Sequence, residues 1–329
     1  MIDTVYIEEG AESYPKAKDI LSRYPKANVI SCKHYKDVFN PAGQSFRIQK
    51  KKPALILARQ TGKLVHPIPP SYGVGGSNNY YFSHLLNCLY DCRYCFLQGM
   101  YPSAHYVLFV NFEDFEEEIR RTTEFNNKPS WFFSGYDCDS LALESVTGFV
   151  AHFLPFFESL PNAWIELRTK STATQVLQKM DPLSNAVVAF SFTPEEISQQ
   201  IEHGVPPVSS RIKKMSLIAE LGWKLGLRID PLIECNDFEF RYSKLFQSIF
   251  ESVNPETIHS VSLGAFRMPQ SFFKKIEKQY PQEPLLAGNF ASQKGYIAYR
   301  EEVEKKLKDL CLNDLLKWIE PEKIFTCDV

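Results

Sequence analysis

Six strand-like segments that alternate with helical stretches constrain the fold of this chain more than any other feature. The predicted strands span residues 80–86, 131–134, 163–169, 186–192, 225–233 and 258–263. Strict alternation with helices favours a parallel sheet joined by right-handed crossovers. Six such units suit an α/β fold with a partial (β/α)6 TIM-like barrel better than a flat doubly wound sheet. In either arrangement, ligands collect at the carboxyl ends of the strands.

The chain is long enough for one barrel with an extension at each end. It has 329 residues, of which 44% are hydrophobic and 14% aromatic, which is enough for a sizeable core. The sequence predicts an N-terminal α/β extension over residues 1–76, a barrel over 77–282 and a C-terminal hairpin and helix extension over 283–329.

The charge and the first residues bear on compartment and partners. The formal net charge is -2, so any contact with nucleic acid would have to be a local basic surface. The start, Met1-Ile2-Asp3-Thr4, does not resemble a signal peptide, and no apolar run is long enough to span a bilayer. We therefore expect a cytoplasmic protein without a membrane partner, in which scattered cysteines are buried as small hydrophobes.

Three cysteines lie on one compact loop after the first barrel strand. Cys88, Cys92 and Cys95 have C-x3-C-x2-C spacing, which is typical of ligands for a soft metal or a cluster. Three thiolates are an incomplete set, so a fourth ligand comes from elsewhere or one position is open for chemistry. In the alternative of a zinc site, His84 would complete the set, but the chain lacks a second short ligand motif. The spacing favours an iron–sulfur cluster with one open iron over zinc and over buried cysteines without metal.

This motif, with an aromatic residue before its third cysteine, resembles that of the radical S-adenosylmethionine (radical SAM) superfamily. The resemblance implies that Cys88, Cys92 and Cys95 hold a [4Fe–4S] cluster whose fourth iron binds S-adenosylmethionine. One electron from the cluster would cleave S-adenosylmethionine to a 5′-deoxyadenosyl radical, which abstracts hydrogen from the substrate. The predicted partial barrel agrees with the fold of that superfamily.

A narrower resemblance, to the spore photoproduct lyase family, covers most of the chain. The matching stretches are Val5-Tyr6-Ile7-Glu8, Cys92 to Gln98, Val110-Asn111, Thr169-Lys170, Phe190-Ser191, Leu225-Gly226-Leu227 with Pro231, and Arg267 with residues 276–281. The resemblance implies a carbon–carbon lyase of DNA repair that reverts a thymine-dimer-type lesion. The implied partners are S-adenosylmethionine, a DNA lesion or nucleotide, and a reducing electron donor of the flavodoxin or ferredoxin type.

The same resemblance suggests roles for residues around the cofactors. Lys170 would contact the carboxylate of S-adenosylmethionine, with a solvated lysine as the alternative. Ser191 and Asp139 would lie near the cofactor, although Ser191 could be satisfied by backbone and Asp139 could cap the following helix. Tyr94 would belong to a hydrogen-return relay, with a packing aromatic as the alternative.

Other candidates come from the strand pattern and from charge. Arg228 and Asp230 alternate with Ile229, so both side chains could point into the barrel and bind the cofactor or a substrate; a buried pair between them is the alternative. Arg267, Lys294 and the lysine run 50–52 are candidate phosphate contacts.

The chain departs from the family at positions that concern the substrate. Tyr136 stands where the family has the cysteine that returns a hydrogen atom, and Cys138 follows two residues later, so either is a candidate donor. Phe96 replaces a relay tyrosine. Phe290 and Ala291 replace an arginine–tyrosine pair that helps to hold the lesion.

Three functional hypotheses follow. The first is a radical enzyme that acts on a thymine lesion in DNA. The second is an enzyme of the same lineage with a different nucleotide or small-molecule substrate. The third is a non-catalytic zinc or nucleic-acid-binding module, which metal analysis would distinguish from the first two.

Overall fold

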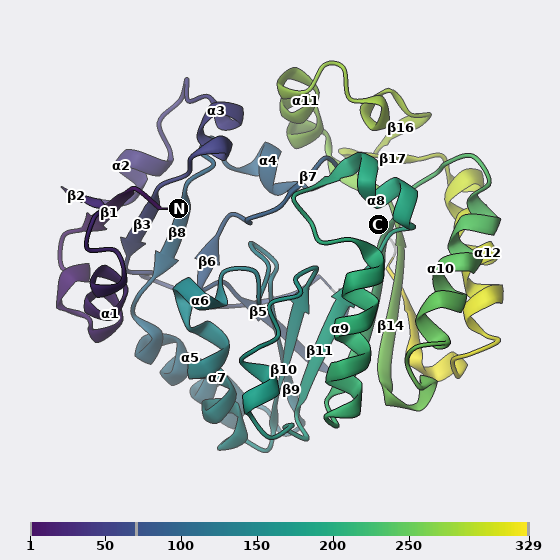
Figure 1. Cartoon of the computed structure of the whole chain (residues 1–329), viewed down its shortest axis with the longest axis horizontal. Helices are drawn as coiled ribbons and strands as arrows, with labels where there is room; N and C mark the ends of the chain where they lie inside the picture. The colour runs from purple at the N-terminus through teal and green to yellow at the C-terminus, as the bar shows by residue number, and fades with distance from the viewer. Residues whose placement is uncertain (1, 70–71, 328–329) are drawn as a thin grey trace.

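An eight-stranded sheet and a five-stranded sheet form the body of the molecule, with helices on their outer sides (Figure 1). The computed structural model describes residues 2–69 and 72–327. The strands are β1 Thr4–Glu8, β2 Asn28–Cys32, β3 Leu55–Ala58, β4 Val65–Pro67, β5 Asn78–Phe82, β6 Leu85–Leu86, β7 Asp91–Cys92, β8 Tyr106–Phe109, β9 Ser130–Ser134, β10 Ala163–Thr169, β11 Ala186–Ser191, β12 Glu202–His203, β13 Lys224–Leu232, β14 Ile258–Ala265, β15 Arg267–Pro269, β16 Phe290–Gln293, β17 Tyr296–Tyr299 and β18 Ile324–Thr326. The helices are α1 Pro15–Arg23, α2 Lys36–Phe39, α3 Phe46–Lys51, α4 Leu97–Met100, α5 Phe112–Phe125, α6 Glu144–Thr147, α7 Phe149–Glu158, α8 Glu195–Ile201, α9 Val208–Glu220, α10 Phe238–Phe250, α11 Gln270–Gln279 and α12 Glu301–Leu315.

The eight-stranded sheet is the predicted partial barrel. Its order is β4-β5-β9-β10-β11-β13-β14-β18, and every pair of neighbours from β5 to β18 is parallel. The sheet curls into a half-barrel with α7, α9 and α10 among the helices on its outside (Figure 1). The predicted fold class is therefore confirmed. The strand near the C-terminus, β18, extends the barrel beyond its six predicted strands.

The five-stranded sheet corrects one predicted strand. Its order is β2-β1-β3-β8-β6, so its last two strands come from beyond residue 76. The segment predicted as one strand, 80–86, is divided: β5 pairs with β9 in the barrel, whereas Leu85 and Leu86 pair antiparallel with β8. The division falls at Ser83 and His84, where the His84 carbonyl accepts a hydrogen bond from the Phe109 amide at 2.9 Å. The predicted domain boundaries stay predictions, and the sheet itself crosses the first of them.

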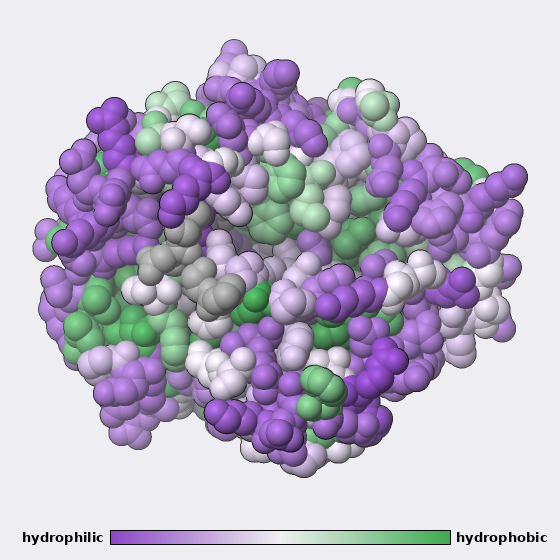
Figure 2. Space-filling view, turned by 180° about the vertical axis from the view of Figure 1, so that it is seen from behind, coloured by the Kyte–Doolittle hydropathy of each residue, from purple (hydrophilic) through white to green (hydrophobic). Residues whose placement is uncertain are grey.

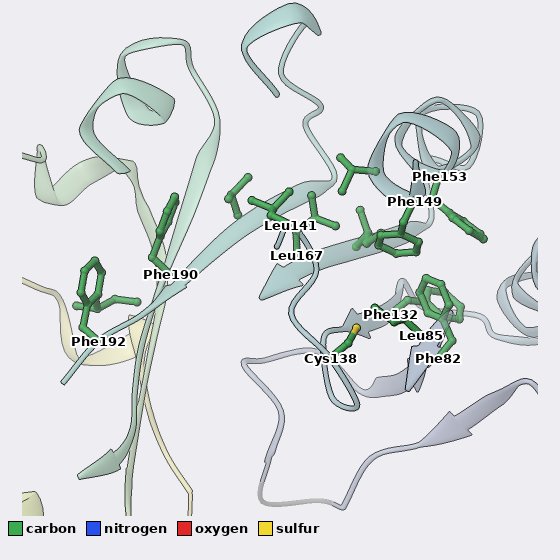
Figure 3. Close-up of a cluster of buried hydrophobic side chains, with 14 of the residues drawn as sticks. Phe82, Leu85, Phe132, Cys138, Leu141, Phe149, Phe153, Leu167, Phe190 and Phe192 are labelled. Atoms are coloured by element: carbon green, nitrogen blue, oxygen red, sulfur yellow. The ribbon is translucent and has the colours of Figure 1, made fainter. Parts of the chain in front are cut away.

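One hydrophobic core joins the two sheets. It extends from Val5 in β1 to Ile319 after α12, and its phenylalanines gather around β5, β9 and α7 (Figure 3). Seen from behind, the surface is mostly hydrophilic, and hydrophobic residues show as several separate areas (Figure 2). In the part of the chain that is described, no helix combines the length and apolarity needed to cross a membrane.

Candidate active site

A cavity of about 700 Å³ opens at the carboxyl ends of the barrel strands. This volume is typical of sites for cofactor-sized ligands. Most of the residues predicted for the site line it, and Arg228 and the lysine run 50–52 do not. The lining ones are Cys88, Cys92, Tyr94, Cys95, Tyr136, Cys138, Asp139, Lys170, Ser191, Asp230, Arg267 and Lys294. Residues far apart in the sequence therefore share one cavity because parallel strands end at the same edge of the sheet.

The cysteine loop is fixed at both of its ends. Asn87 has a left-handed backbone, with φ of 71°, and its side-chain amide donates to the carbonyls of Ser103 at 2.8 Å and His105 at 2.7 Å. After the loop, Gly99 of α4 lies so close to α11 that a Cβ there would be 2.5 Å from the Phe272 carbonyl oxygen. The loop is therefore held between the five-stranded sheet and the C-terminal part of the chain.

The three thiols lie at the cavity wall in a low-dielectric environment. Burial raises the pKa of Cys88 to about 12 and also raises the pKa values of Cys92 and Cys95, so the thiols stay protonated without a metal. A bound metal reverses this preference because it deprotonates its thiol ligands. The Tyr90 amide donates to the Cys88 sulfur at 3.4 Å, which favours a thiolate there.

The geometry does not fit a closed zinc site that uses His84. Burial lowers the pKa of His84 to about 3, and its ring stacks on Phe149 at 3.7 Å between centroids, inside the hydrophobic core. Among the described residues, no three His, Cys, Asp or Glu side chains are grouped closely enough to hold a single metal ion. The loop instead presents three separate thiols to one cavity, which suits a cluster that takes one thiolate per iron.

A buried glutamate that the sequence did not predict holds two of the predicted residues. Glu202 of β12 accepts a hydrogen bond from the Tyr94 hydroxyl, and its carboxylate lies 3.6 Å from the Lys170 ammonium and 2.9 Å from the Arg211 guanidinium. Burial alone would raise the pKa of Glu202, but Lys170 and Arg211 lower it to about 2. Because β12 pairs with β7 and aligns Glu202 with Cys92, this network also fixes the cysteine loop.

Asp139 holds the end of β10. Its carboxylate accepts hydrogen bonds from the Thr169 hydroxyl at 2.7 Å and from the Lys170 amide at 2.6 Å. It also accepts from the Leu141 and Ala142 amides, at 3.0 and 2.9 Å, as a residue at the start of a turn does. Asp139 therefore lines the cavity as predicted, but its oxygens are engaged with the backbone around Lys170.

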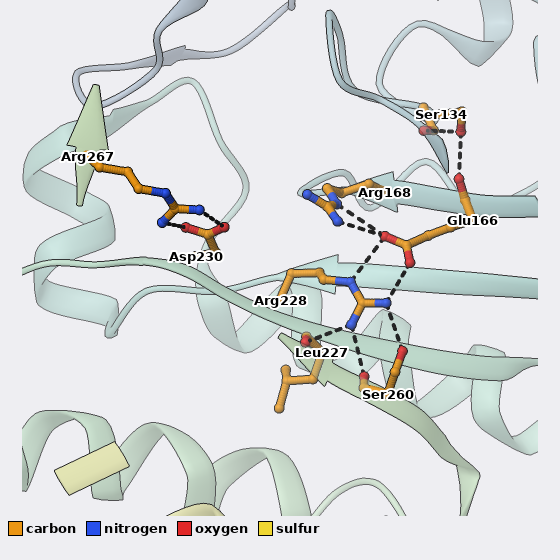
Figure 4. Close-up of polar contacts among 9 residues, drawn as sticks. Ser134, Glu166, Arg168, Leu227, Arg228, Asp230, Ser260 and Arg267 are labelled. Atoms are coloured by element: carbon orange, nitrogen blue, oxygen red, sulfur yellow. Dashed lines mark hydrogen bonds and ion pairs between the residues drawn. The ribbon is translucent and has the colours of Figure 1, made fainter. Parts of the chain in front are cut away.

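Two of the predicted cations have partners that the sequence did not indicate. Arg228 is buried below the cavity and donates to the Glu166 carboxylate at 2.6 Å, so the predicted direct contact with a cofactor has no geometric support (Figure 4). The alternative pair between Arg228 and Asp230 is wrong, because Asp230 pairs with Arg267 at 3.2 Å. Arg267 also donates to the Tyr72 hydroxyl at 2.8 Å, so it is a cavity residue and not a free surface cation.

The loop after β9 brings both candidate hydrogen donors to the cavity. Gly135 makes this path possible: its φ is +87°, and a Cβ there would lie 2.8 Å from the Ser140 hydroxyl oxygen and 3.0 Å from the Arg168 carbonyl oxygen. Cys138 packs into the apolar core near the ends of the first strands (Figure 3). Tyr136 instead stacks on Tyr81 at 5.0 Å between centroids.

The remaining candidates line the cavity or lie outside it. Ser191 and Lys294 line the cavity, with Lys294 at the turn between β16 and β17. Lys50 donates to the Cys88 carbonyl and Lys52 pairs with Asp3 at 2.7 Å. Two lysines of the run therefore contact the cysteine loop and the N-terminal sheet. These contacts weaken the prediction that the run binds phosphate.

Comparison with known proteins gives one consistent result. The family model described as "Spore photoproduct lyase" matches residues 1–306. The chain is 23% identical over 297 residues to a spore photoproduct lyase of Bacillus subtilis, covering 85% of this chain and 83% of the relative. It is 20% identical over 327 residues to a spore photoproduct lyase of Clostridium acetobutylicum, covering 96% of this chain and 95% of the relative.

Solved structures with the same name share the fold of the whole chain. A spore photoproduct lyase complexed with dinucleoside spore photoproduct matches with a TM-score of 0.84 at 18% identity, covering 100% of this chain and 98% of that one. A double mutant with bound AdoMet and dinucleoside spore photoproduct gives the same values. The resemblance found in the sequence is therefore confirmed, and the match of the family model to nearly the whole length shows that this chain belongs to the spore photoproduct lyase family.

Proposed function

We propose that this chain is a radical SAM lyase that acts on a thymine-dimer-type lesion in DNA. The observation that carries the proposal is that three cysteine thiols, Lys170 and Cys138 line one cavity at the strand ends. Family membership supports the lyase class, and the solved relatives named for bound AdoMet and dinucleoside spore photoproduct support the ligands. A lesion in duplex DNA would have to be extruded to enter the cavity, at a cost of about a few kcal/mol.

The residues fit the two cofactors. Cys88, Cys92 and Cys95 would hold a [4Fe–4S] cluster, and Lys170 would bind the carboxylate of S-adenosylmethionine. When bound, the two cofactors supply the radical that removes hydrogen from the substrate. Asp139 and Glu202 position Lys170, one through its backbone amide and the other through its ammonium.

Hydrogen return is assigned to Cys138 in preference to Tyr136. A thiol is the better hydrogen-atom donor, and Cys138 lines the same cavity as the cluster cysteines. The pKa of Cys138 is raised by burial, which keeps its hydrogen in place. Tyr94, held by Glu202, is the cavity tyrosine that we assign to the relay.

The substitution pattern supports a second candidate, an enzyme of the same lineage with another nucleotide or small-molecule substrate. Phe96 lines the cavity where the resemblance implies a relay tyrosine, and it cannot pass a hydrogen. Phe290 packs against Phe266 at 4.9 Å between centroids, so this hairpin position contributes apolar packing instead of an arginine. These changes fall at positions for which the resemblance implies substrate or relay roles, whereas the cysteines and Lys170, for which it implies cofactor roles, are kept.

An external electron donor would need access to the cysteine loop. Leu89 and Phe96 are 44% and 38% exposed beside the three thiols, and Met100 of α4 is 38% exposed. We propose that this apolar surface receives the donor of the flavodoxin or ferredoxin type.

The test is anaerobic reconstitution with iron and sulfide, followed by incubation with lesion DNA, S-adenosylmethionine and dithionite. The proposal expects brown protein with about four irons per chain, cleavage of S-adenosylmethionine and restored thymine. Cleavage without restored thymine would favour the second candidate. Colourless protein with one zinc would contradict both and favour a binding module. The matched control replaces all three of Cys88, Cys92 and Cys95 by alanine.

A further inference from the structure

The floor of the cavity holds more positive charge than the protein neutralises. Glu166, on β10, lies between two arginines: Arg168 donates to its Oε1 at 3.0 Å, and Arg228 donates to its Oε2 at 2.6 Å (Figure 4). Burial opposes the ionised form, but the two arginines lower the pKa of Glu166 to about 2. One carboxylate therefore faces two guanidinium groups, and the cluster of three residues carries a net positive charge.

Arg168 is the arginine with donors left over. Arg228 is 1% exposed and also donates to the Ser260 carbonyl at 3.0 Å and the Ser260 hydroxyl at 2.9 Å, so its donors are used inside the barrel. The Arg168 side chain is 24% exposed and lines the cavity. Its Nε and one Nη donate to Glu166, and among the described residues its other Nη has no acceptor. The free edge of this guanidinium is available to a ligand.

Tyr136 supplies a second unused donor beside Arg168. The Arg168 guanidinium carbon lies 5.7 Å from the centre of the Tyr136 ring. The Tyr136 hydroxyl is buried, and within the described residues it has no hydrogen-bond partner. A buried polar group without a partner is uncommon in native proteins and points to a ligand that completes it. Burial raises the pKa of Tyr136, so the hydroxyl keeps its proton and can donate.

This pair lies apart from the cofactor side of the cavity. Lys170 lies 3.6 Å from the Glu202 carboxylate and 5.4 Å from the centre of the Tyr94 ring, in the network that fixes the cysteine loop. Arg168 instead contacts the Glu166 carboxylate at 3.0 Å and the Tyr136 ring. Lys170 can therefore serve the carboxylate of S-adenosylmethionine while Arg168 remains free for a different anion.

We propose that Arg168 and the Tyr136 hydroxyl form an anion subsite that binds the phosphodiester joining the two nucleosides of the substrate. A guanidinium with a free edge suits a phosphate oxygen, and the hydroxyl adds a second donor. Aromatic side chains of Tyr72, Phe266 and Tyr296 line the same cavity and offer stacking surfaces for bases. The identity of the anion rests on the proposed function, whereas the subsite itself does not.

The experiment compares two ligands on the holoenzyme saturated with S-adenosylmethionine under anaerobic conditions. One is the lesion dinucleotide with its bridging phosphate, and the other is the lesion dinucleoside without it. The subsite predicts about tenfold tighter binding of the dinucleotide to the unaltered protein. The ratio of the two dissociation constants should fall to about one in Arg168→Gln and be partly kept in Arg168→Lys. It should be unchanged in the control Arg121→Gln, on the outer surface of α5.

Tyr136→Phe keeps the inference testable if Arg168→Gln folds poorly. It removes only a hydroxyl without a partner, so stability should be unaffected or increased while the phosphate preference falls several-fold. An equal preference in the unaltered protein, Arg168→Gln and Tyr136→Phe would overturn the subsite.

Inorganic phosphate separates this inference from the proposed function. If neither lesion binds, the proposed substrate is wrong, but phosphate should still bind the unaltered holoenzyme and not Arg168→Gln. Equal phosphate binding to both proteins would overturn the subsite regardless of the substrate.

Discussion

Cys138 is the residue on which the proposed hydrogen-return step depends. In Cys138→Ala, we expect cleavage of S-adenosylmethionine to continue, because the cluster cysteines and Lys170 are unchanged, while restored thymine falls to background. Product analysis by mass spectrometry after anaerobic incubation measures both. Cys311→Ala is the matched control, because Cys311 is also buried but lies in α12. Normal repair by Cys138→Ala would show that another group, such as Tyr136, donates the hydrogen.

Protonation of Glu166 should lower the free energy of unfolding at acid pH. Its pKa is lowered from 4.5 to about 2 in the folded state. Its stabilising contribution is therefore complete above pH 4.5 and is lost as the pH falls toward 2. In Glu166→Gln, we expect unfolding to be about 3 kcal/mol easier at neutral pH, because Arg228 loses its buried partner.

The measurement is urea unfolding of both proteins between pH 7 and pH 3. The difference in the free energy of unfolding between them should stay constant from pH 7 to about 4.5 and shrink as the pH falls from there to 3. Glu117→Gln, which changes an exposed glutamate of α5, should show neither effect. A constant difference between pH 7 and pH 3 would contradict the assignment.

At the scale of elements, the two-residue ladder between β7 and β12 connects the cysteine loop to the barrel. Glu202 is the buried carboxylate of that ladder, and Arg211 is 0% exposed beside it. In Glu202→Gln, we expect a loss of about 3 kcal/mol in the free energy of unfolding, because a buried guanidinium loses its charged partner. Iron occupancy after reconstitution should fall as well, because Tyr94 and Lys170 lose their anchor.

Urea unfolding and iron analysis on the same preparations check this prediction. Glu196→Gln serves as the control, since it breaks a surface pair with Arg241 at 3.1 Å and should cost less than about 1 kcal/mol. Full iron occupancy in Glu202→Gln would mean that the loop holds its shape without this anchor.

The elements also show what the sequence could predict. The barrel strands are predictable because each is an apolar run bounded by turns, and the site candidates are predictable because they follow strand ends. The division of 80–86 was not predictable, since Leu85 and Leu86 are as apolar as a barrel strand and only their pairing with β8 distinguishes them. Asn111, a residue type that commonly caps helices, directly precedes α5, but its side chain bonds to Gln60 and Asp114 instead of capping the helix.

Within the site, the sequence could not predict how deeply each side chain is buried or which side chain it pairs with. Strand alternation indicated that Arg228 points inward, but not that it lies below the cavity on Glu166. No sequence pattern indicates that Glu202 belongs to the site, because it reaches the site from the end of a helix more than a hundred residues after the cysteine loop. The motif could identify the three thiols because their spacing is local, whereas buried ion pairs are set by the tertiary fold.

For the whole molecule, we expect the N-terminal sheet and the barrel to unfold together, because they share one hydrophobic core. Ile56 of β3 is completely buried in the core that also contains Phe132 of the barrel. All four tryptophans, Trp131, Trp164, Trp223 and Trp318, lie outside the N-terminal region. Tryptophan fluorescence therefore reports on the barrel side alone, which makes the coupling measurable.

In Ile56→Ala, we expect the unfolding midpoint followed by tryptophan fluorescence to shift together with that followed by far-ultraviolet circular dichroism. The loss should be about 2–5 kcal/mol, as for a large-to-small change in a packed core. Val29→Ala in β2, where the side chain is 53% exposed, should change stability by less than about 0.5 kcal/mol. An unshifted fluorescence transition in Ile56→Ala would show that residues 1–76 unfold as a separate unit, as the predicted domain boundary implies. A common shift would mean that the cavity depends on both sheets, because the loop that carries Cys88 begins at β6 of one sheet and lines the cavity at the strand ends of the other.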